Sequence, residues 1–431
     1  MTLPLRRAAA YALVSTFALA APLLGRFAAV PFAVVAVVAY AVTDGPAFGL
    51  FAFPWDEHVG RLETLVGFAL GATGLGVLVP AFGLPVGVFV AATLAVGYGD
   101  FGRRLVLEYR ENEVAGNAGF VVVAAAAAFL GQVVVAAAAT PTQAFLAVSA
   151  GLLAGLLRAV FTPRDYPYVV VSVAFLCWLF TALAVTPTWL RVAVAVGLTV
   201  VFGGLSFAVG ATSVPGMLTG VFLGVLAVVL GGYGWFVVLV TFFAVGSLST
   251  KYRYDEKAAR GVAEENDGAR GTGNVLGNSL AALLALLGYA ASPATGLPAA
   301  LFAFAFASSV ATALADTLSS EFGTLYGPPR LLTTFETVPP GTDGGVTWQG
   351  ELAGVAGAVC IAALSVALLA FSTAGAAAVV VGGVVGMTVD SLTGATVEGG
   401  LVGNQTVNFL ATLSGAVAGA VAAVLLGLVV F

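Results

Sequence analysis

The sequence predicts an all-α membrane protein, a polytopic bundle of transmembrane helices. Of its 431 residues, 60% are hydrophobic and only 9% are charged, and the mean hydropathy is +1.06. Soluble domains carry roughly 25% charged residues, so this composition excludes an ordinary soluble protein. Apolar runs of about 20 residues recur along the whole chain, and each is long enough to cross a bilayer. Because these runs do not alternate between polar and apolar residues, they indicate helices rather than the strands of a barrel.

Apolar runs, and the glycine, proline or charged breaks between them, predict about fifteen spans. In chain order we expect these at 8–25, 27–43, 64–80, 83–98, 117–139, 142–158, 168–186, 190–209, 214–230, 233–248, 274–291, 298–318, 351–371, 374–390 and 405–431. The first run follows a basic start and ends in "ALA", which also fits a signal peptide. We expect a retained helix because a second apolar run follows it directly.

The basic residues indicate which side of the membrane each connection faces. With the N terminus inside, 14 of the 16 lysine and arginine residues lie at that terminus or in one set of connections. The opposite set holds only Arg26 and Arg191. Cytoplasmic loops are enriched in lysine and arginine, so we expect a cytoplasmic N terminus in a multi-pass protein of the cell membrane. All 21 acidic residues lie in or beside the same set, which places the expected polar site on the cytoplasmic face.

We expect two membrane domains, seven spans in 1–189 and eight in 190–431, and the second contains two repeated motifs. "DTLS" at 316–319 resembles "DSLT" at 390–393, and "GNVLGN" at 273–278 resembles "GNQTVN" at 403–408. Each Asp motif ends an inward-running span, and each Asn pair starts an outward-running one. The four motifs are therefore expected at one depth, around one polar pocket near the cytoplasmic interface.

The acidic residues of this region predict a magnesium site. Oxygen ligands suit Mg²⁺, which proteins hold with one or two carboxylates together with substrate phosphates. The expected metal ligands are Asp316, Asp343 and Asp390, with Glu321 and Glu398 as further candidates. The expected catalytic residues are Asp316, Asp343 and Glu321.

The neutral and basic residues of the same motifs predict phosphate binding. Side chains at helix starts add donors where the helix dipole already favours anions, and glycine-rich turns present backbone N–H groups. Basic side chains neutralise phosphate charge. The expected substrate-binding residues are Asn274, Asn278, Asn404, Asn408, Arg270, Lys251, Thr342, Gly344 and Gly345.

Each feature also has a simpler interpretation. Asp316 fits a solvated helix end, "GTDGG" fits an ordinary turn, and the asparagines fit caps or hydrogen bonds between helices. The run 251–267 is expected to be a solvated amphipathic loop helix in which Arg260 pairs with Glu256 or Glu264. The expected convergence of independent segments at one depth is what favours a functional site.

The second half also resembles a known family. "TKYRYDEKAARG", "ARGTGNVLGN", "ADTLSSEFG", "TVPPGTDGGVTWQGELAG" and "DSLTGATVEGG" resemble the DUF92 membrane family over about 195–431. Because that family includes the plant phytyl-phosphate kinase, the resemblance implies a phosphotransferase that converts a prenyl monophosphate to the diphosphate in isoprenoid salvage. The implied cofactors are Mg²⁺ and CTP or ATP. The implied partners are the lipid bilayer and a prenyl phosphate, and no nucleic acid.

The first half is similar, more distantly, to the dolichol and phytol kinase group. The stretch "GYGDFGRRLVLEYRENEVAGNAGF" carries this resemblance, with Asp100 followed by "GRR". The lysine, threonine and glutamate of the group's next turn are absent. The resemblance therefore implies a degenerate polyprenol kinase-like domain or a lipid-binding one.

Two other functions remain open. The same site suits a cytidylyltransferase that acts on a lipid phosphate, and a polytopic bundle also suits a transporter or lipid flippase. A carboxylate-lined cavity in the middle of the bilayer would favour transport. A lipid-facing groove that ends at Asp316 and Asp343 would favour the enzyme.

Overall fold

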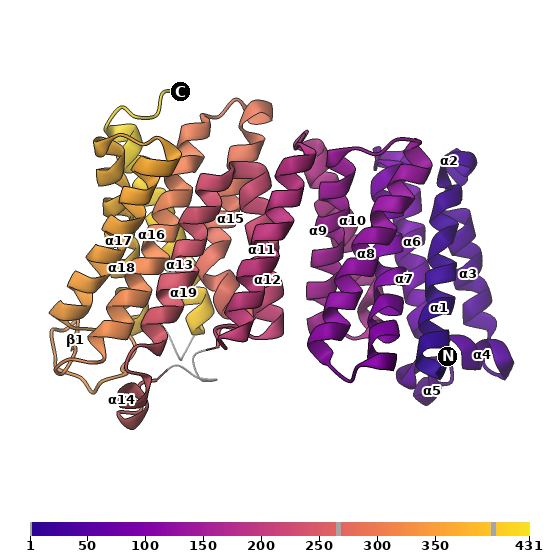
Figure 1. The fold of residues 1–431 in the computed structure, drawn as a ribbon, viewed down its shortest axis with the longest axis horizontal. Helices are drawn as coiled ribbons and strands as arrows, with labels where there is room; N and C mark the ends of the chain where they lie inside the picture. Colours follow the sequence, from indigo (N-terminus) through magenta and orange to yellow (C-terminus); the bar gives the residue numbers. More distant parts are fainter. Residues whose placement is uncertain (1, 264–268, 398–401) are drawn as a thin grey trace. The chain divides into compact units, whose positions relative to one another are not determined.

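The structure is a computed structural model that describes residues 2–263, 269–397 and 402–431 (Figure 1). Its described elements are helices, apart from one two-stranded sheet. The chain forms two compact units, Met1–Val194 and Ala195–Phe431, called unit 1 and unit 2 below. The boundary falls within α11 (Trp189–Ala208), which begins at the expected boundary between 189 and 190.

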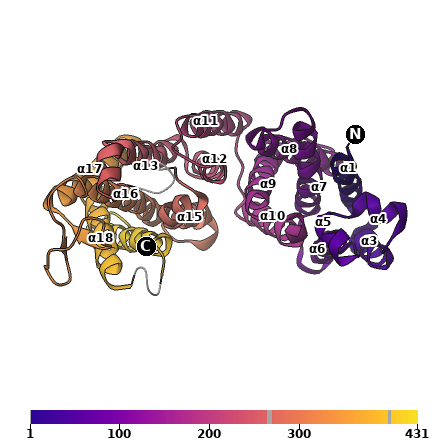
Figure 2. The same cartoon turned by 90° about the horizontal axis from the view of Figure 1, so that it is seen from below.

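Unit 1 is built around the long helix α7 (Val86–Tyr109), which packs against α1, α6, α8, α9 and α10 (Figure 2). Close packing with α8 depends on small residues, because a Cβ atom on Gly102 would lie 2.5 Å from the carbonyl oxygen of Gly119. The other helices of the unit are α1 (Leu3–Ser15), α2 (Ala21–Leu24), α3 (Val30–Ala41), α4 (Gly45–Phe51), α5 (Pro54–Val59), α6 (Glu63–Phe82), α8 (Glu113–Ala136), α9 (Pro141–Val160) and α10 (Tyr166–Ala182). Short 3₁₀ segments are η1 (Thr16–Ala20), η2 (Gly25–Phe27) and η3 (Pro163–Asp165).

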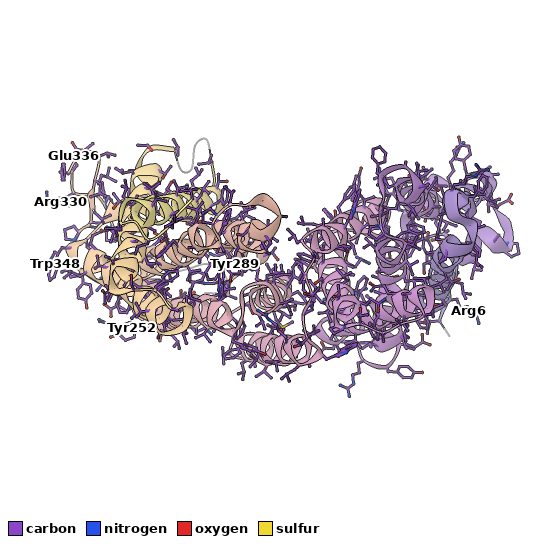
Figure 3. All side chains as sticks on the ribbon, turned by 90° about the horizontal axis from the view of Figure 1, so that it is seen from above. Arg6, Tyr252, Tyr289, Arg330, Glu336 and Trp348 are labelled. Carbon is purple, nitrogen blue, oxygen red and sulfur yellow. The ribbon has the colours of Figure 1, made fainter. Side chains whose placement is uncertain are left out.

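Unit 2 is built around α16 (Ala299–Gly323), which α13, α15, α17, α18 and α19 surround (Figure 2). The other helices are α12 (Val214–Leu226), a π-helical turn η4 (Ala227–Gly231), α13 (Tyr233–Lys251), α14 (Tyr254–Ala259), α15 (Thr272–Thr295), α17 (Trp348–Leu369), α18 (Thr373–Val397) and α19 (Asn404–Leu425). Strands β1 (Arg330–Leu331) and β2 (Gly345–Val346) pair antiparallel between α16 and α17. Arg330, Glu336 and Trp348 lie at the same edge of the unit (Figure 3).

The membrane-spanning all-α fold is confirmed. Thirteen described helices are long and apolar enough to cross a bilayer, or up to 14 if α3 and α4, which meet at a bend of 116°, form one span. Every expected apolar run overlaps a helix, and α7 stands outside the thirteen. The figure of about fifteen spans and the side of the N terminus stay predictions.

Several expected helix ends are wrong: the run 374–390 continues as α18 to Val397, and two further helices continue past charged residues. The run 83–98 continues as helix α7 to Tyr109, so Asp100 lies inside a helix rather than in a loop. The run 298–318 continues as α16 to Gly323, so Asp316 and Glu321 precede the end of that helix. In both cases the charged side chains pair with groups on neighbouring helices, which allows the helix to continue past them.

Candidate functional site

A polar cavity of about 290 Å³ lies at one end of unit 2, where four helices and the loop before β2 meet. The helices contribute the ends of α16 and α18 and the starts of α15 and α19. Most expected site residues line this polar cavity: Asp316, Asp343, Asp390, Glu321, Asn274, Asn278, Asn404, Asn408, Arg270, Thr342, Gly344 and Gly345. Lys251 is not among its lining residues. Thus both repeated motifs open onto one space.

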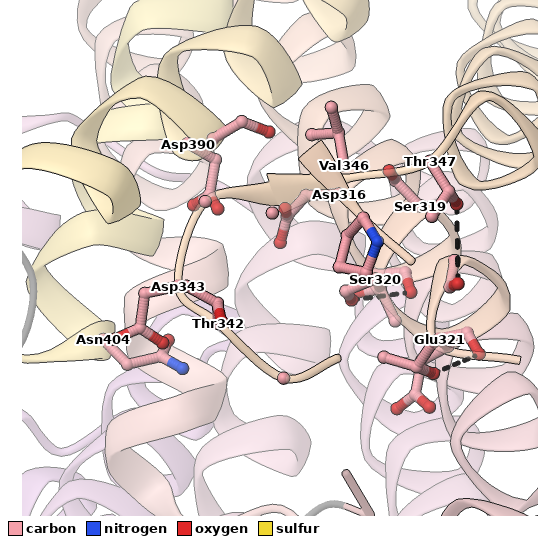
Figure 4. Close-up of a pocket in the computed structure, with 18 of the residues that line it drawn as sticks. Asp316, Ser319, Ser320, Glu321, Thr342, Asp343, Val346, Thr347, Asp390 and Asn404 are labelled. Carbon is pink, nitrogen blue, oxygen red and sulfur yellow. Dashed lines mark hydrogen bonds between the residues drawn. The ribbon is translucent and has the colours of Figure 1, made fainter. Parts of the chain in front are cut away.

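The two aspartates of the repeated motif face each other (Figure 4). Asp316 and Asp390 each lie seven residues before the end of their helix, α16 and α18, and their side chains share a hydrogen bond. Two carboxylates in contact repel unless a proton or a cation lies between them. The Oδ1 atom of Asp390 is buried and has no hydrogen-bond partner among the described residues. This pair is therefore suited to a cation.

Close packing brings the two Asn pairs together at the starts of α15 and α19. A Cβ atom on Gly273 would lie 2.8 Å from the amide group of Gln405, and one on Gly277 would lie 2.9 Å from its carbonyl oxygen. A larger residue at Gly277 would push the backbone of α19 away, whereas at Gly273 the Gln405 side chain would have to move. The Nδ2 atom of Asn278 donates to the carbonyl of Asn274 at 3.0 Å. The Oδ1 atom of Asn274 is buried without a partner among the described residues.

The glycine-rich loop that carries Asp343 is fixed to α18. Gly344 has φ +71°, and a Cβ atom there would lie 2.3 Å from the carbonyl oxygen of Ser391. Only glycine satisfies both restrictions. The Oγ1 atom of Thr342 donates to the Pro339 carbonyl at 2.8 Å, and the Gly345 N–H donates to the Thr342 carbonyl at 3.0 Å. The Thr342 hydroxyl and the Gly345 N–H therefore form their hydrogen bonds within the turn, and these bonds stabilise the loop.

Glu321 has a partner that the sequence did not reveal. The Nζ atom of Lys257 lies 2.6 Å from its Oε2 atom, and Lys257 is 1% exposed. The same ammonium donates to the carbonyls of Ser249 and Thr250 at 2.9 and 2.8 Å, at the end of α13. The expectation of a solvated loop helix over 251–267 is therefore wrong at Lys257, because α14 packs this side chain inward against α16. The predicted pair of Arg260 with Glu256 is present at 2.5 Å, whereas Glu264 and Glu398 lie outside the described residues.

The two basic residues expected at the site have different positions. Lys251 is exposed and its ammonium donates to the carbonyl of Val209, just beyond the end of α11, where a helix dipole favours a positive charge. Arg270 lines the polar cavity, and its backbone pairs with the Ala211 carbonyl and the Ser213 N–H. Its guanidinium lies 5.1 Å from the ring centre of Phe242. Arg270 is thus the fixed positive charge of the site.

The charges of the polar cavity favour a divalent cation. Asp316, Asp343 and Asp390 outnumber Arg270 by two, while Glu321 is balanced by Lys257. No group of three histidine, cysteine, aspartate or glutamate side chains in the described part of the chain is arranged to hold a metal by itself. Two close carboxylates plus substrate oxygens are nevertheless the usual ligand set of Mg²⁺. The residues present therefore fit a magnesium ion held jointly with a phosphate.

Comparison with known families confirms the family resemblance of the second half. The model of the integral membrane protein family DUF92 matches residues 197–418, from α11 to α19. The chain belongs to the DUF92 family. The match lies within unit 2 and covers the polar cavity.

Several curated proteins resemble this DUF92 chain. An uncharacterized membrane protein of Synechocystis is 36% identical over 191 residues, 43% of this chain and 72% of the relative. One from Methanocaldococcus jannaschii is 35% identical over 220 residues, 47% of this chain and 82% of the relative. Protein VTE6, chloroplastic, of Arabidopsis thaliana is 32% identical over 153 residues, 35% of this chain and 46% of that protein. No solved structure matches the chain significantly.

Proposed function

We propose that this DUF92 chain is a membrane kinase that transfers phosphate from CTP, or another nucleoside triphosphate, to a prenyl monophosphate. The observation that carries the proposal is the meeting of Asp316, Asp390, the Asn pairs and the Asp343 loop around one acidic cavity. An acidic site binds a phosphate only together with a cation. Phosphoryl transfer requires mainly this positioning and charge neutralisation, without a histidine or cysteine nucleophile.

The residues divide into two proposed groups. Asp316 and Asp390 would hold Mg²⁺ together with phosphate oxygens, and the ion would neutralise charge on the phosphates; Asp343 would come from the loop as a further ligand only after that loop moves toward the pair. Arg270 and the amides of Asn274 and Asn404 would bind phosphate oxygens at the helix starts. Glu321 would position α14 through Lys257 rather than act as a base, because its carboxylate already forms an ion pair with the Lys257 ammonium.

Space for two substrates supports transfer between them. A wider cavity of about 680 Å³ adjoins the polar cavity and shares Arg270, Asn274, Asp343 and Asn404 with it. A nucleotide in one cavity and a phosphate acceptor in the other would therefore meet at these shared residues. Such adjacency is what an in-line transfer needs.

An apolar pocket on the same helices supports a lipid acceptor. About 510 Å³ in volume, it is lined on α15 by Ala281 and Leu284, on α16 by Phe302 and Ala305, and on α19 by Leu413 and neighbouring residues. Ala305 and Asp316 are eleven residues, about three turns, apart and so share a face of α16. A tail in this pocket would lie on the helices that carry the site. The positive-inside pattern supports a cytoplasmic position of the polar cavity.

The purified full-length protein in lipid nanodiscs, with Mg²⁺ and a panel of prenyl monophosphates, tests the proposal. CTP is supplied with ³²P either at the γ or at the α position. Transfer of the γ label to lipid supports a kinase. Transfer of the α label would instead establish a cytidylyltransferase, and no transfer from CTP or ATP at any chain length would reject both nucleotide reactions.

A further inference from the structure

Unit 1 contains a second cluster of buried charged residues, outside the DUF92 match. Asp100 on α7 is 2% exposed and lies between two arginines, Arg104 on α7 and Arg158 on α9. Tyr166, the first residue of α10, is also buried and lies within electrostatic reach of all three. Tyr11 on α1 packs against Tyr166, with 6.1 Å between ring centres. These five residues, the Asp100 cluster, come from four helices.

The charged groups of the Asp100 cluster face one another without closing into hydrogen bonds. The Nε atom of Arg158 lies 3.7 Å from Oδ1 of Asp100, and the Nε atom of Arg104 lies 4.0 Å from Oδ2. Both Asp100 oxygens, both Nε atoms and the Tyr11 hydroxyl are buried without a hydrogen-bond partner among the described residues. A buried polar atom without a partner destabilises the fold, so this arrangement is suited to a bound group that supplies both donors and acceptors.

The net charge of the Asp100 cluster limits which kind of group can bind there. Two guanidinium groups and one carboxylate leave one positive charge in a largely buried position. Among the neighbouring charges, Arg7 pairs with Glu57 at 2.5 Å, so these two residues together add no net charge. Asp56, the other acid near Tyr11, accepts hydrogen bonds from Phe53 and Thr64, whereas both arginines of the cluster lie against Asp100. A single negative charge would therefore balance the cluster.

We propose that the Asp100 cluster is a binding site for a phosphate group in its monoanionic, protonated form. The unprotonated oxygens of such a group accept from Arg104, Arg158 and the tyrosine hydroxyls. Its P–OH group donates to the carboxylate of Asp100, which accepts only. Sulfate, which carries no proton at neutral pH, would instead be repelled by that carboxylate. The site is thus selective for phosphate over sulfate.

The position of the cluster gives it access to one membrane surface. Arg158 lies two residues before the end of α9, and Tyr166 begins α10 after the short connection. Asp100 lies nine residues, about 14 Å, before the end of α7. The phosphate can therefore be a free ion or the head group of a phosphomonoester lipid.

Binding of ³²P-phosphate to the full-length protein in phosphatidylcholine nanodiscs tests the site, with EDTA present throughout. Removal of divalent cations separates it from the acidic cavity of unit 2, which requires one. The wild-type protein should bind phosphate at least about tenfold more tightly than sulfate. Arg158→Gln and Arg104→Gln should each weaken phosphate binding about tenfold. Asp100→Asn should keep phosphate binding but bring the phosphate-to-sulfate ratio close to one.

Matched controls make the result decisive. Arg103→Gln removes an adjacent arginine that pairs with Glu113 on the surface, and it should leave phosphate binding unchanged. Displacement of the label by phosphatidic acid in the nanodisc would identify a lipid head group as the occupant, and no displacement would identify free phosphate. Absence of phosphate binding by the correctly folded wild type, or equal binding by the arginine variants, would overturn the proposal. Equal affinities for sulfate and phosphate in the wild type would overturn the role of Asp100.

Discussion

The two units use buried carboxylates in opposite ways. In unit 1, Asp100 lies between two arginines, and the cluster carries an excess positive charge. In unit 2, Asp316 meets a second carboxylate, Asp390, in a cavity that carries excess negative charge. A buried charge must be balanced, and unit 1 balances its carboxylate with more positive charge than that carboxylate needs, which leaves a position for an anion. In unit 2 the acids of the cavity outnumber its basic side chains, so they require a cation from solution.

The largest expected effect concerns unit 2, whose cavity has excess negative charge. Asp316→Asn and Asp390→Asn remove a proposed Mg²⁺ ligand and should lower γ-phosphate transfer by about 100-fold or more, because the cation stabilises the transferring phosphoryl group by several kcal/mol. Binding of Mn²⁺, followed by electron paramagnetic resonance, should fall in parallel. Asp255→Asn, on the exposed side of α14, is the matched control and should change neither. Normal transfer by both cavity variants would remove this acid pair from the mechanism.

The second prediction compares an ion pair at hydrogen-bond distance, Lys257 with Glu321, with a longer one, Arg104 with Asp100. Lys257→Met leaves Glu321 buried beside no cation and should lower the free energy of unfolding by about 3–5 kcal/mol. Arg104→Gln should cost much less, because its Nε atom lies 4.0 Å from Asp100, beyond hydrogen-bond distance, and Arg158 remains. Thermal unfolding in a single detergent measures both. The double variant Lys257→Met with Glu321→Met should recover part of the loss; equal melting of Lys257→Met and wild type would contradict a structural role for the pair.

The third prediction concerns the loop that carries Asp343. Gly344→Ala forces a side chain into a left-handed conformation, which costs about 1–2 kcal/mol, and into contact with the Ser391 carbonyl. It should lower transfer activity more than it lowers the melting temperature, since the loop moves while the helices stay packed. Gly341→Ala is the matched control: it has φ +83°, but its Cβ atom would meet only a Val262 side chain at 3.0 Å. Similar losses in both variants would show that strain alone, rather than contact with α18, is responsible.

The smallest effect is expected from changes that only report topology. In a background with Cys177 and Cys360 replaced by alanine, Asp255→Cys and Thr295→Cys should retain activity. An impermeant thiol reagent should label Thr295→Cys in intact cells but reach Asp255→Cys only after lysis, as the positive-inside pattern predicts. The reverse labelling would place the polar cavity on the outer face.

The sequence predicted the helices and the residues around the cavity well. It did not predict which buried charged side chains pair with one another. Hydropathy located the apolar runs because each span must satisfy its own backbone in lipid. The repeated "DTLS" and "DSLT" motifs correctly pointed to one shared space, since equal positions on inward-running helices impose equal depth. Lys257 was missed because its partner Glu321 is 64 residues away and only α14 packing turns the lysine inward. Asp100 was misplaced for the same reason, as the counter-charge of Arg158 comes from another helix.

Because the glycine-rich loop is attached to α18, the three aspartates of the cavity are carried by two separate parts of unit 2. Asp343 and Asp390 are both tied to α18, whereas Asp316 belongs to α16. One turn from Asp390 and Asp316, a Cβ atom on Gly386 would lie 2.3 Å from the Thr312 side chain, and Gly382 fits against Ser308 in the same way. The spacing between Asp316 and Asp390 is therefore set by a seam of small residues between α16 and α18, and not by the loops that line the cavity.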